Sequence, residues 1–142
     1  MNFETLLGRH MKDDVVVEVL EVHDMQVVYD FDRTHENLED VYWAAAPSRG
    51  FQFRFDQDQK LDVVFIYIMS SEGFAPIARD DVEVPVFQTF DHAKEEFVRA
   101  GTPFSESPGE KWWVKGDFGA HTRHYQFRDG ALFRLTLSTK RA

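Results

Sequence analysis

Hydrophobic and polar residues alternate along two stretches of the chain, and each stretch predicts a β-hairpin. Residues 51–55 place phenylalanine at every second position, and an apolar run over 61–69 follows a short polar segment. Near the carboxyl end, residues 125–127 and 131–137 alternate in the same way around Arg128-Asp129-Gly130, a segment of typical turn composition. Because side chains of a strand point to opposite faces in turn, each hairpin presents one apolar face to a core.

The register of each hairpin can be predicted by matching apolar faces. A two-residue loop at Asp129-Gly130 would put Phe127 opposite Leu132 but Tyr125 opposite Arg134, which mixes the two faces. We therefore predict three-residue loops in both hairpins, with Gly130 in the left-handed position of a bulged turn. The predicted loops are Gln57–Gln59 and Arg128–Gly130, and the predicted pairs are Asp56 with Lys60, Phe55 with Leu61, Phe53 with Val63, Phe51 with Phe65, Phe127 with Ala131, Tyr125 with Phe133, and Arg123 with Leu135.

A helix is predicted before the second hairpin. Residues 91–101 are rich in good helix formers, with Asp91 suited to the N-cap and Arg99 to the last turn. Gly101 can end the helix in the left-handed conformation, and Pro103 cannot continue it.

The segment before the first hairpin is less clear. Residues 15–22 are so rich in valine that propensity favours a strand. Asp13 or Asp14 can nevertheless cap a helix whose apolar residues share one face, and a helix here would match the helix before the second hairpin. We predict a helix over 15–22, preceded by a short helix that begins within Asn2–Leu7 and ends at Gly8.

The two helix-plus-hairpin units suggest an internal repeat. The hairpin loops near 58 and 129 lie 71 residues apart, and a unit of that size cannot bury its sheet face alone. We predict one α+β domain over 1–142, made of two tandem helix/β-hairpin repeats that share one antiparallel sheet with helices on one face; a coincidental αβ arrangement is the alternative. The predicted parts are repeat 1 at about 1–75, a linker at about 76–86 and repeat 2 at about 87–142, with further strands at Val27–Phe31, Val41–Ala45 and Lys111–Lys115.

Charge is distributed unevenly along the chain. Of 16 basic and 25 acidic residues, nine basic and 23 acidic precede position 111, whereas residues 111–142 carry seven basic and two acidic. The net charge is therefore −14 in the first part and +5 in the second. A predominantly negative field repels nucleic acid and attracts cationic partners, although an acidic surface can also serve solubility alone.

Composition excludes several classes of protein. No stretch approaches the ~20 apolar residues of a membrane span, and Met1–Glu4 lacks the features of a signal peptide, so we expect a cytoplasmic protein without a membrane role. The sequence has no cysteine. Of its six histidines only His121 and His124 are close, and on a strand they would point to opposite faces. No nucleophile or phosphate-loop motif is present, so we expect no catalytic residues, metal or cofactor.

Three segments resemble small bacterial immunity proteins of toxin and immunity pairs. They are Leu6-Leu7-Gly8-Arg9, Ala93–Pro103 and Tyr125–Leu137. The tandem helix-plus-hairpin plan is also similar to that of the β-lactamase inhibitory protein. The resemblance implies a non-enzymatic inhibitor that docks on a toxin domain and blocks its active site or substrate groove.

One candidate binding segment combines carboxylates with large aromatic residues. Carboxylates can capture Lys and Arg of a partner, and aromatic side chains are typical interface anchors. The alternative is a soluble loop followed by a core strand. The candidate residues are Asp30, Asp32, Glu36, Glu39, Asp40, Tyr42 and Trp43.

Trp112 and Trp113 form the second candidate. Because successive side chains of a strand point to opposite faces, the two indoles lie on opposite faces of the sheet. We therefore expect one in the core and the other on an open face or under a helix. An exposed tryptophan on an open face would be a suitable anchor.

These features predict a binding protein that inhibits a cationic protein partner and is a monomer or weak homodimer. The alternative is a small-ligand binder or cofactor-free enzyme, in which a curved sheet and its many aromatic residues enclose an apolar cavity. A closed cavity with a buried carboxylate or histidine would favour that alternative, and a filled core would count against it.

Overall fold

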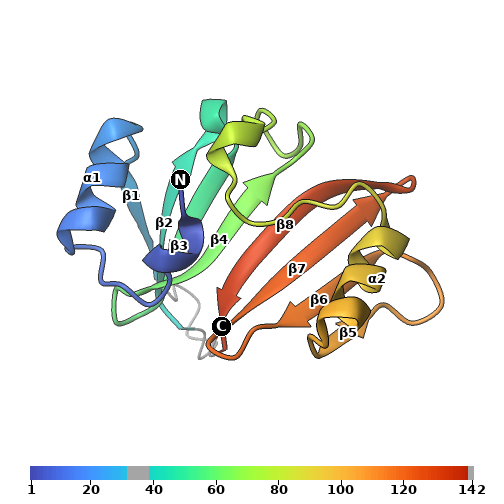
Figure 1. The fold of residues 1–142 in the computed structure, drawn as a ribbon. Coiled ribbons are helices and arrows are strands. Elements are labelled where there is room, and N and C mark those ends of the chain that lie inside the picture. Colours follow the sequence, from blue (N-terminus) through green and yellow to red (C-terminus); the bar gives the residue numbers. More distant parts are fainter. Residues whose placement is uncertain (32–38, 141–142) are drawn as a thin grey trace.

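One antiparallel sheet of eight strands organises the fold, with strand order β1-β2-β3-β4-β8-β7-β6-β5. The structure is a computed structural model that describes residues 1–31 and 39–140. Two α-helices accompany the sheet, each preceding four strands of one half (Figure 1). The elements are α1 Asp14–Val22, β1 Val27–Asp30, β2 Val41–Ala46, β3 Phe51–Phe55, β4 Leu61–Tyr67, α2 Phe90–Ala100, β5 Phe104–Glu106, β6 Trp113–Asp117, β7 His121–Arg128 and β8 Ala131–Thr139, with 3₁₀ helices at Phe3–Leu6, Pro47–Arg49 and Arg79–Asp81.

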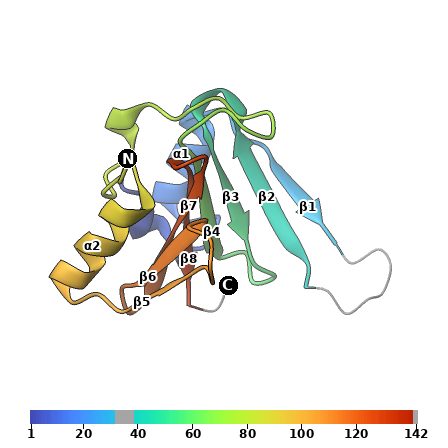
Figure 2. The same cartoon turned by 90° about the vertical axis from the view of Figure 1, so that its right-hand side faces the viewer.

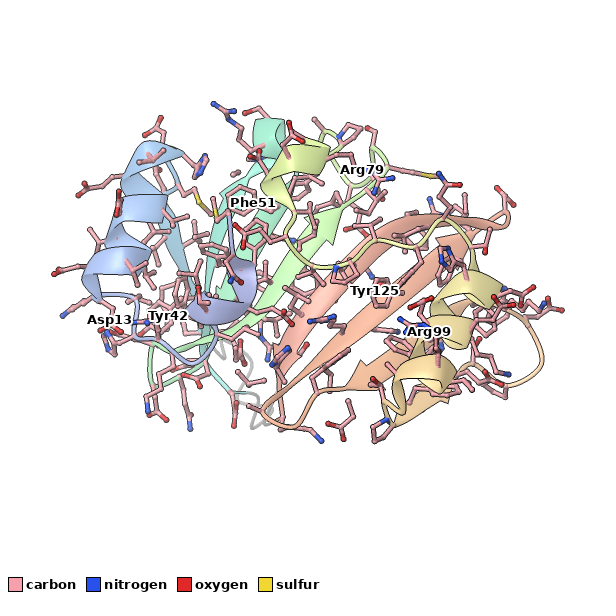
Figure 3. The ribbon with its side chains drawn as sticks, in the orientation of Figure 1. Asp13, Tyr42, Phe51, Arg79, Arg99 and Tyr125 are labelled. Atoms are coloured by element: carbon pink, nitrogen blue, oxygen red, sulfur yellow. The ribbon has the colours of Figure 1, made fainter. Side chains whose placement is uncertain are left out.

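Both α-helices and the amino-terminal 3₁₀ helix pack on the same face of the sheet (Figures 1 and 2). We call it the helix-covered face, and Figure 3 shows Tyr42, Phe51 and Tyr125 projecting from it. The ring of Phe3 lies 5.2 Å from that of Phe51, and the ring of Phe97 from α2 lies 5.9 Å from that of Tyr125. This confirms an α+β fold with one antiparallel sheet and helices on one face.

α1 forms where it was predicted, despite its weak helix propensity. Val16 is fully buried and Leu20 is half-buried against the core. Burial of this apolar face outweighs the entropic cost of β-branched residues in a helix. Asp13 occupies the N-cap position, but its side chain makes no capping hydrogen bond.

α2 begins earlier than predicted. The N-cap is Thr89, whose hydroxyl oxygen accepts a hydrogen bond from the backbone N–H of His92 at 3.2 Å, so the prediction of Asp91 as N-cap is wrong. Phe90 begins the helix because its side chain is buried there. Gly101 ends the helix at φ 72°, as predicted. None of the described helices has the length and apolarity that a membrane crossing requires.

The predicted loop of the second hairpin is wrong. Arg128 pairs with Ala131, which leaves a two-residue loop at Asp129-Gly130 with both φ angles positive. Phe127 then pairs with Leu132, and a β-bulge at the next position restores the match of apolar faces, so that Tyr125 lies opposite Leu135. The prediction assumed an unbroken register and so rejected the shorter loop.

The first hairpin keeps its predicted loop but not its predicted register. The backbone N–H of Asp56 donates to the carbonyl of Lys60 at 2.8 Å, and Phe55 pairs with Leu61. A bulge at Asp62 then shifts the ladder by one residue. Phe53 therefore pairs with Val64 and Phe51 with Ile66, in place of the predicted partners Val63 and Phe65.

The remaining strands are close to their predicted places. β1, β2 and β6 coincide within two residues with the predicted strands, while β5 was not predicted because it is short and carries serine and glutamate. Residues 76–86 connect the two halves. Gly50 contacts their start so closely that a Cβ atom there would lie 2.5 Å from the carbonyl oxygen of Ala75.

A partly buried ion pair ties the amino terminus to β7. Arg123 donates two hydrogen bonds of 2.9 Å to the carboxylate of Glu4, and His121 also contacts it. Burial alone would raise the pKa of Glu4, but the hydrogen bond from Arg123 and the charges of Arg123 and His121 outweigh it and lower this pKa below its usual value.

We predict that Glu4→Gln destabilises the fold by about 1–2 kcal/mol at neutral pH, because the Arg123 guanidinium loses its charged partner. Since the folded-state pKa of Glu4 is lowered, its contribution is complete above the unfolded-state pKa of about 4.3 and disappears as the pH falls through the folded-state value. Urea denaturation from pH 3 to 7 measures this, and a difference between variant and wild type that does not shrink below pH 4 would contradict it.

We also predict that Phe53→Ala and Phe127→Ala each lower the free energy of unfolding by about 3–5 kcal/mol, because both side chains are buried on the helix-covered face. Val98 is 63% exposed on α2, so Val98→Ala is the control and should change stability by less than about 0.5 kcal/mol. Midpoints of denaturation equal to wild type in both Phe variants would contradict this placement.

Candidate functional site

The face of the sheet opposite the described helices carries aromatic side chains at both of its halves. We call it the open face; its central residues are Trp43, Arg54, Phe65, Thr136, His124 and Trp113, which the strand registers place on one side. Trp43 stacks on Phe65, with ring centroids 6.0 Å apart and planes 26° from parallel. Both rings are half-buried, so the open face presents a fixed aromatic surface at β2 and β4.

An acidic depression borders this aromatic surface. It has a volume of about 210 Å³ and is lined by Glu39, Arg54, Asp56, Gln57, Asp58 and Asp62. Arg54 is the cross-strand neighbour of Trp43 and donates hydrogen bonds of 3.1 and 2.6 Å to the two oxygens of Asp62. The hydrogen bond to Asp62 raises the pKa of Arg54. One guanidinium faces four carboxylates, so the depression is net negative.

The other half of the open face is polar and basic. The rings of Trp113 and His124 lie 5.3 Å apart in an edge-to-face arrangement. Arg134 donates a 2.7 Å hydrogen bond to Gln126, and Lys115 is exposed. Burial and the positive charges of Lys115 and Arg134 lower the pKa of His124 to about 4. The open face is therefore acidic near the β3–β4 loop and basic near β6 and β7.

The predicted acidic segment divides among three places. Glu39 lines the acidic depression, and Asp30 ends β1 on the side of the open face. Asp40 accepts a 2.7 Å hydrogen bond from the hydroxyl of Tyr29, which raises the pKa of Tyr29 to about 12. Two predicted members, Asp32 and Glu36, lie outside the described residues.

The two predicted aromatic residues of this segment lie on opposite faces. Trp43 is on the open face, whereas Tyr42 is on the helix-covered face, where its ring stacks on that of Tyr29 with centroids 4.9 Å apart. Period-two alternation explains the division. Trp43 is therefore the residue of the pair that can contact a partner on the open face.

The prediction that one residue of the Trp112–Trp113 pair lies in the core is wrong. β6 begins at Trp113, whose indole is half-buried on the open face, and Trp112 precedes the strand and is 62% exposed. Both line a groove of about 450 Å³ with Arg128 and Phe133. Near this groove the core is formed by Phe90 and Phe127, whose rings lie 5.9 Å apart.

Sequence reasoning missed several residues of the site. Asp56 and Asp58 could have been included, because the predicted strand at 41–45 and the hairpin at 51–69 are neighbours in sequence. Asp62 and Phe65 were assigned no such role; the predicted register places Phe65 on the helix-covered face, and the bulge that turns it to the open face leaves no sequence signal. His121 and His124 point to opposite faces of β7, as predicted: His121 contacts Glu4 on the helix-covered face, and His124 packs against Trp113 on the open face.

The space between sheet and helices is occupied by side chains in the described part of the chain. Phe3, Phe51, Phe53 and Phe55 are each at most 2% exposed, and their rings contact one another in sequence. The larger depressions among the described residues open to solvent. An enclosed cavity with a buried carboxylate or histidine, which the alternative hypothesis expects, is not among these depressions of the described residues.

Comparison with protein families, with curated proteins and with solved structures finds no significant match to this chain.

We predict that His124 makes stability depend on pH between about 4 and 6.5. Because the folded-state pKa is lowered, the unfolded chain binds the proton more readily, and stability falls as the pH drops below the unfolded value of about 6.5. His124→Gln should flatten the curve of unfolding free energy against pH in this window. His92, which is exposed on α2, provides the control variant His92→Gln; equal slopes in the two variants would contradict the prediction.

Proposed function

We propose that the protein is a binding module that inhibits a basic partner protein, as an immunity protein neutralises a cognate bacterial toxin domain. The observation that carries the proposal is Trp43, held against Phe65 on the open face beside the acidic depression. Protein interfaces typically have aromatic residues at their centre and polar or charged residues at their rim. Trp43 and the carboxylates beside it have this arrangement.

The anchor and the charges have different parts in this proposal. An exposed ion pair is worth only ~0–1 kcal/mol, so the carboxylates of the depression alone could steer a partner but not hold it. An aromatic residue that fills a partner pocket can contribute ~2 kcal/mol or more. Trp43 therefore sets the lifetime of the complex, and the acidic depression sets the rate of encounter.

The open face has the dimensions of a protein interface. Trp43 on β2 and Trp113 on β6 are separated by five strand spacings, or roughly 24 Å at about 4.8 Å each. A typical interface buries about 800 Å² on each partner, and a square patch of that area is about 28 Å wide, close to this separation. The proposed partner contacts the acidic half with its basic residues and can reach Trp113 with the same surface.

The proposal includes an internal duplication. The order of elements in each half is one helix followed by four strands, and β4 pairs with β8 at the centre of the sheet. The bulges at Asp62 and Phe133 lie 71 residues apart, and the hairpin loops at 57–59 and 129–130 have nearly the same spacing. These correspondences support two tandem repeats. The proposed location is the cytoplasm, which the cysteine-free composition favours.

The first test is capture of a partner from the native host by the tagged full chain, followed by identification of the captured protein. We expect a partner with a basic surface whose activity falls on binding. An acidic partner, or one whose activity is unchanged in the complex, would contradict the proposal.

We predict that Trp43→Ala raises the dissociation rate of the purified complex about 30-fold, as the loss of ~2 kcal/mol implies, with little change in association. Surface plasmon resonance measures both rates. Val98→Ala removes an exposed apolar side chain from α2 and is the control. An unchanged dissociation rate for folded Trp43→Ala would exclude this anchor.

The triple variant Glu39→Gln, Asp56→Asn and Asp58→Asn should instead slow association, most strongly at low salt, because screening acts over ~8 Å at physiological ionic strength. The matched control neutralises three exposed carboxylates away from the depression: Asp80→Asn, Glu95→Gln and Glu110→Gln. Equal effects of the two triple variants would show that net charge, and not the depression, steers the partner.

A further inference from the structure

β1 is an edge strand whose side chains are exposed on both faces. All four residues from Val27 to Asp30 are exposed, and Val28 reaches 60%. Among the described strands only β2 pairs with it. The outer edge of β1 therefore offers backbone groups to another extended chain, in the way that strand addition requires.

The pattern of hydrogen bonds identifies the residues that point outward. The N–H of Tyr67 donates to the carbonyl of Gly50 at 2.9 Å, so this carbonyl points to β4; the N–H of Gly50 donates to the carbonyl of Ala46 in the preceding turn. Because the direction alternates along a strand, the backbone groups of Phe51 and Phe53 point to β2. The partners of these residues in β2, Ala46 and Ala44, therefore bond to β3.

The same alternation continues into β1. Trp43 follows Tyr42 and precedes Ala44, so its backbone groups bond to its partner Val28 in β1. Val28 and Asp30 thus bond to β2, and Val27 and Tyr29 direct their N–H and C=O groups away from the sheet. These two residues are the hydrogen-bonding positions of the free edge.

The stretch of sequence that contains this edge strand is predominantly acidic. Residues 13–31, which include α1 and β1, carry six carboxylates and no lysine or arginine: Asp13, Asp14, Glu18, Glu21, Asp24 and Asp30. A second copy of this chain would bring the same charges together at the edge and be repelled. An extended segment with alternating basic residues matches both the charge and the exposed apolar side chains.

We infer that the outer edge of β1 accepts an extended cationic segment of the partner as a ninth strand. The inference rests on the proposed function and adds a second contact with the same partner, besides that of Trp43. Val28 is the cross-strand neighbour of Trp43 and lies on the same face, so the edge and the aromatic anchor form one continuous surface. Main-chain bonds to Val27 and Tyr29 supply affinity, and the carboxylates around them select basic side chains.

The test uses a seven-residue capped peptide with lysine at odd positions and valine at even positions. Binding is followed on the full chain by amide NMR and hydrogen exchange. We expect exchange at the Tyr29 amide to slow at least tenfold in the complex. Val28 and Asp30 serve as internal controls, because their amides are already bonded to β2 and should change little.

Two altered peptides separate charge from backbone pairing. Glutamate in place of lysine should weaken binding at least tenfold, and so should methylation of the three central amides of the cationic peptide. Failure of the cationic peptide to bind, binding without slower exchange at Tyr29, or equal binding of either altered peptide would overturn the inference. In the absence of peptide, exchange at the Tyr29 amide is measured at several protein concentrations. If it slows as the concentration rises, a second copy of the chain occupies the edge, and the inference is overturned.

Variants of the protein complete the test. Val27→Pro removes an outward N–H at the first residue of an edge strand, where proline is tolerated, and should weaken peptide binding at least tenfold. Val27→Thr keeps the N–H and should bind as wild type. With a captured partner, loss of affinity in Trp43→Ala but not in Val27→Pro would overturn strand addition and leave the proposed function standing. A captured partner that is not inhibited, with peptide binding as expected, would remove the proposed function alone.

Discussion

The pairing of β4 with β8 is the constraint on which the rest of the structure depends. It joins the halves of the sheet through Val64 opposite Leu137 and Ile66 opposite Leu135, all buried on the helix-covered face. A shift of one residue would turn these side chains to the open face and bring polar neighbours such as Thr136 into the core. The register of this single pair therefore decides which residues of both halves can form one surface for a partner.

Two bulges make that register compatible with the hairpins. β4 contains the run Val63-Val64-Phe65-Ile66, in which every residue is apolar, so its sequence fits either face. The bulge at Asp62 selects Val64 and Ile66 for the core, and the ion pair of Asp62 with Arg54 satisfies the carboxylate that the bulge buries. The bulge at Phe133 has the same effect in β8, where Leu132 and Leu135 both remain buried.

The periodic elements of the fold could be predicted from the sequence, and its irregular ones could not. Alternation in β3 and β8, and the capping glycine of α2, are local signals and led to correct strands and helices. The valine-rich α1 was predicted from its position in the repeat, since its propensity favours a strand. Bulges, by contrast, are chosen by tertiary packing, and for this reason both predicted registers were wrong; the core position of a tryptophan was wrong because β6 begins only at Trp113. The composition of the candidate site was the least predictable part, because Phe65 reaches the open face only through a bulge.

The bulge at Asp62 also connects the fold to the site. In the unbroken register, Phe65 would lie opposite Phe51 in the core, and Trp43 would have no ring to stack on. With the bulge, Phe65 holds the indole on the open face one strand from the sheet edge, while Asp62 and Arg54 border the acidic depression beside it. Trp43 in turn bonds through its backbone to Val28 of the edge strand. The one residue inserted at Asp62 thus brings Trp43, the acidic depression and the outer edge of β1 into a single surface. This bulge could not be predicted from the sequence, yet the candidate site depends on it.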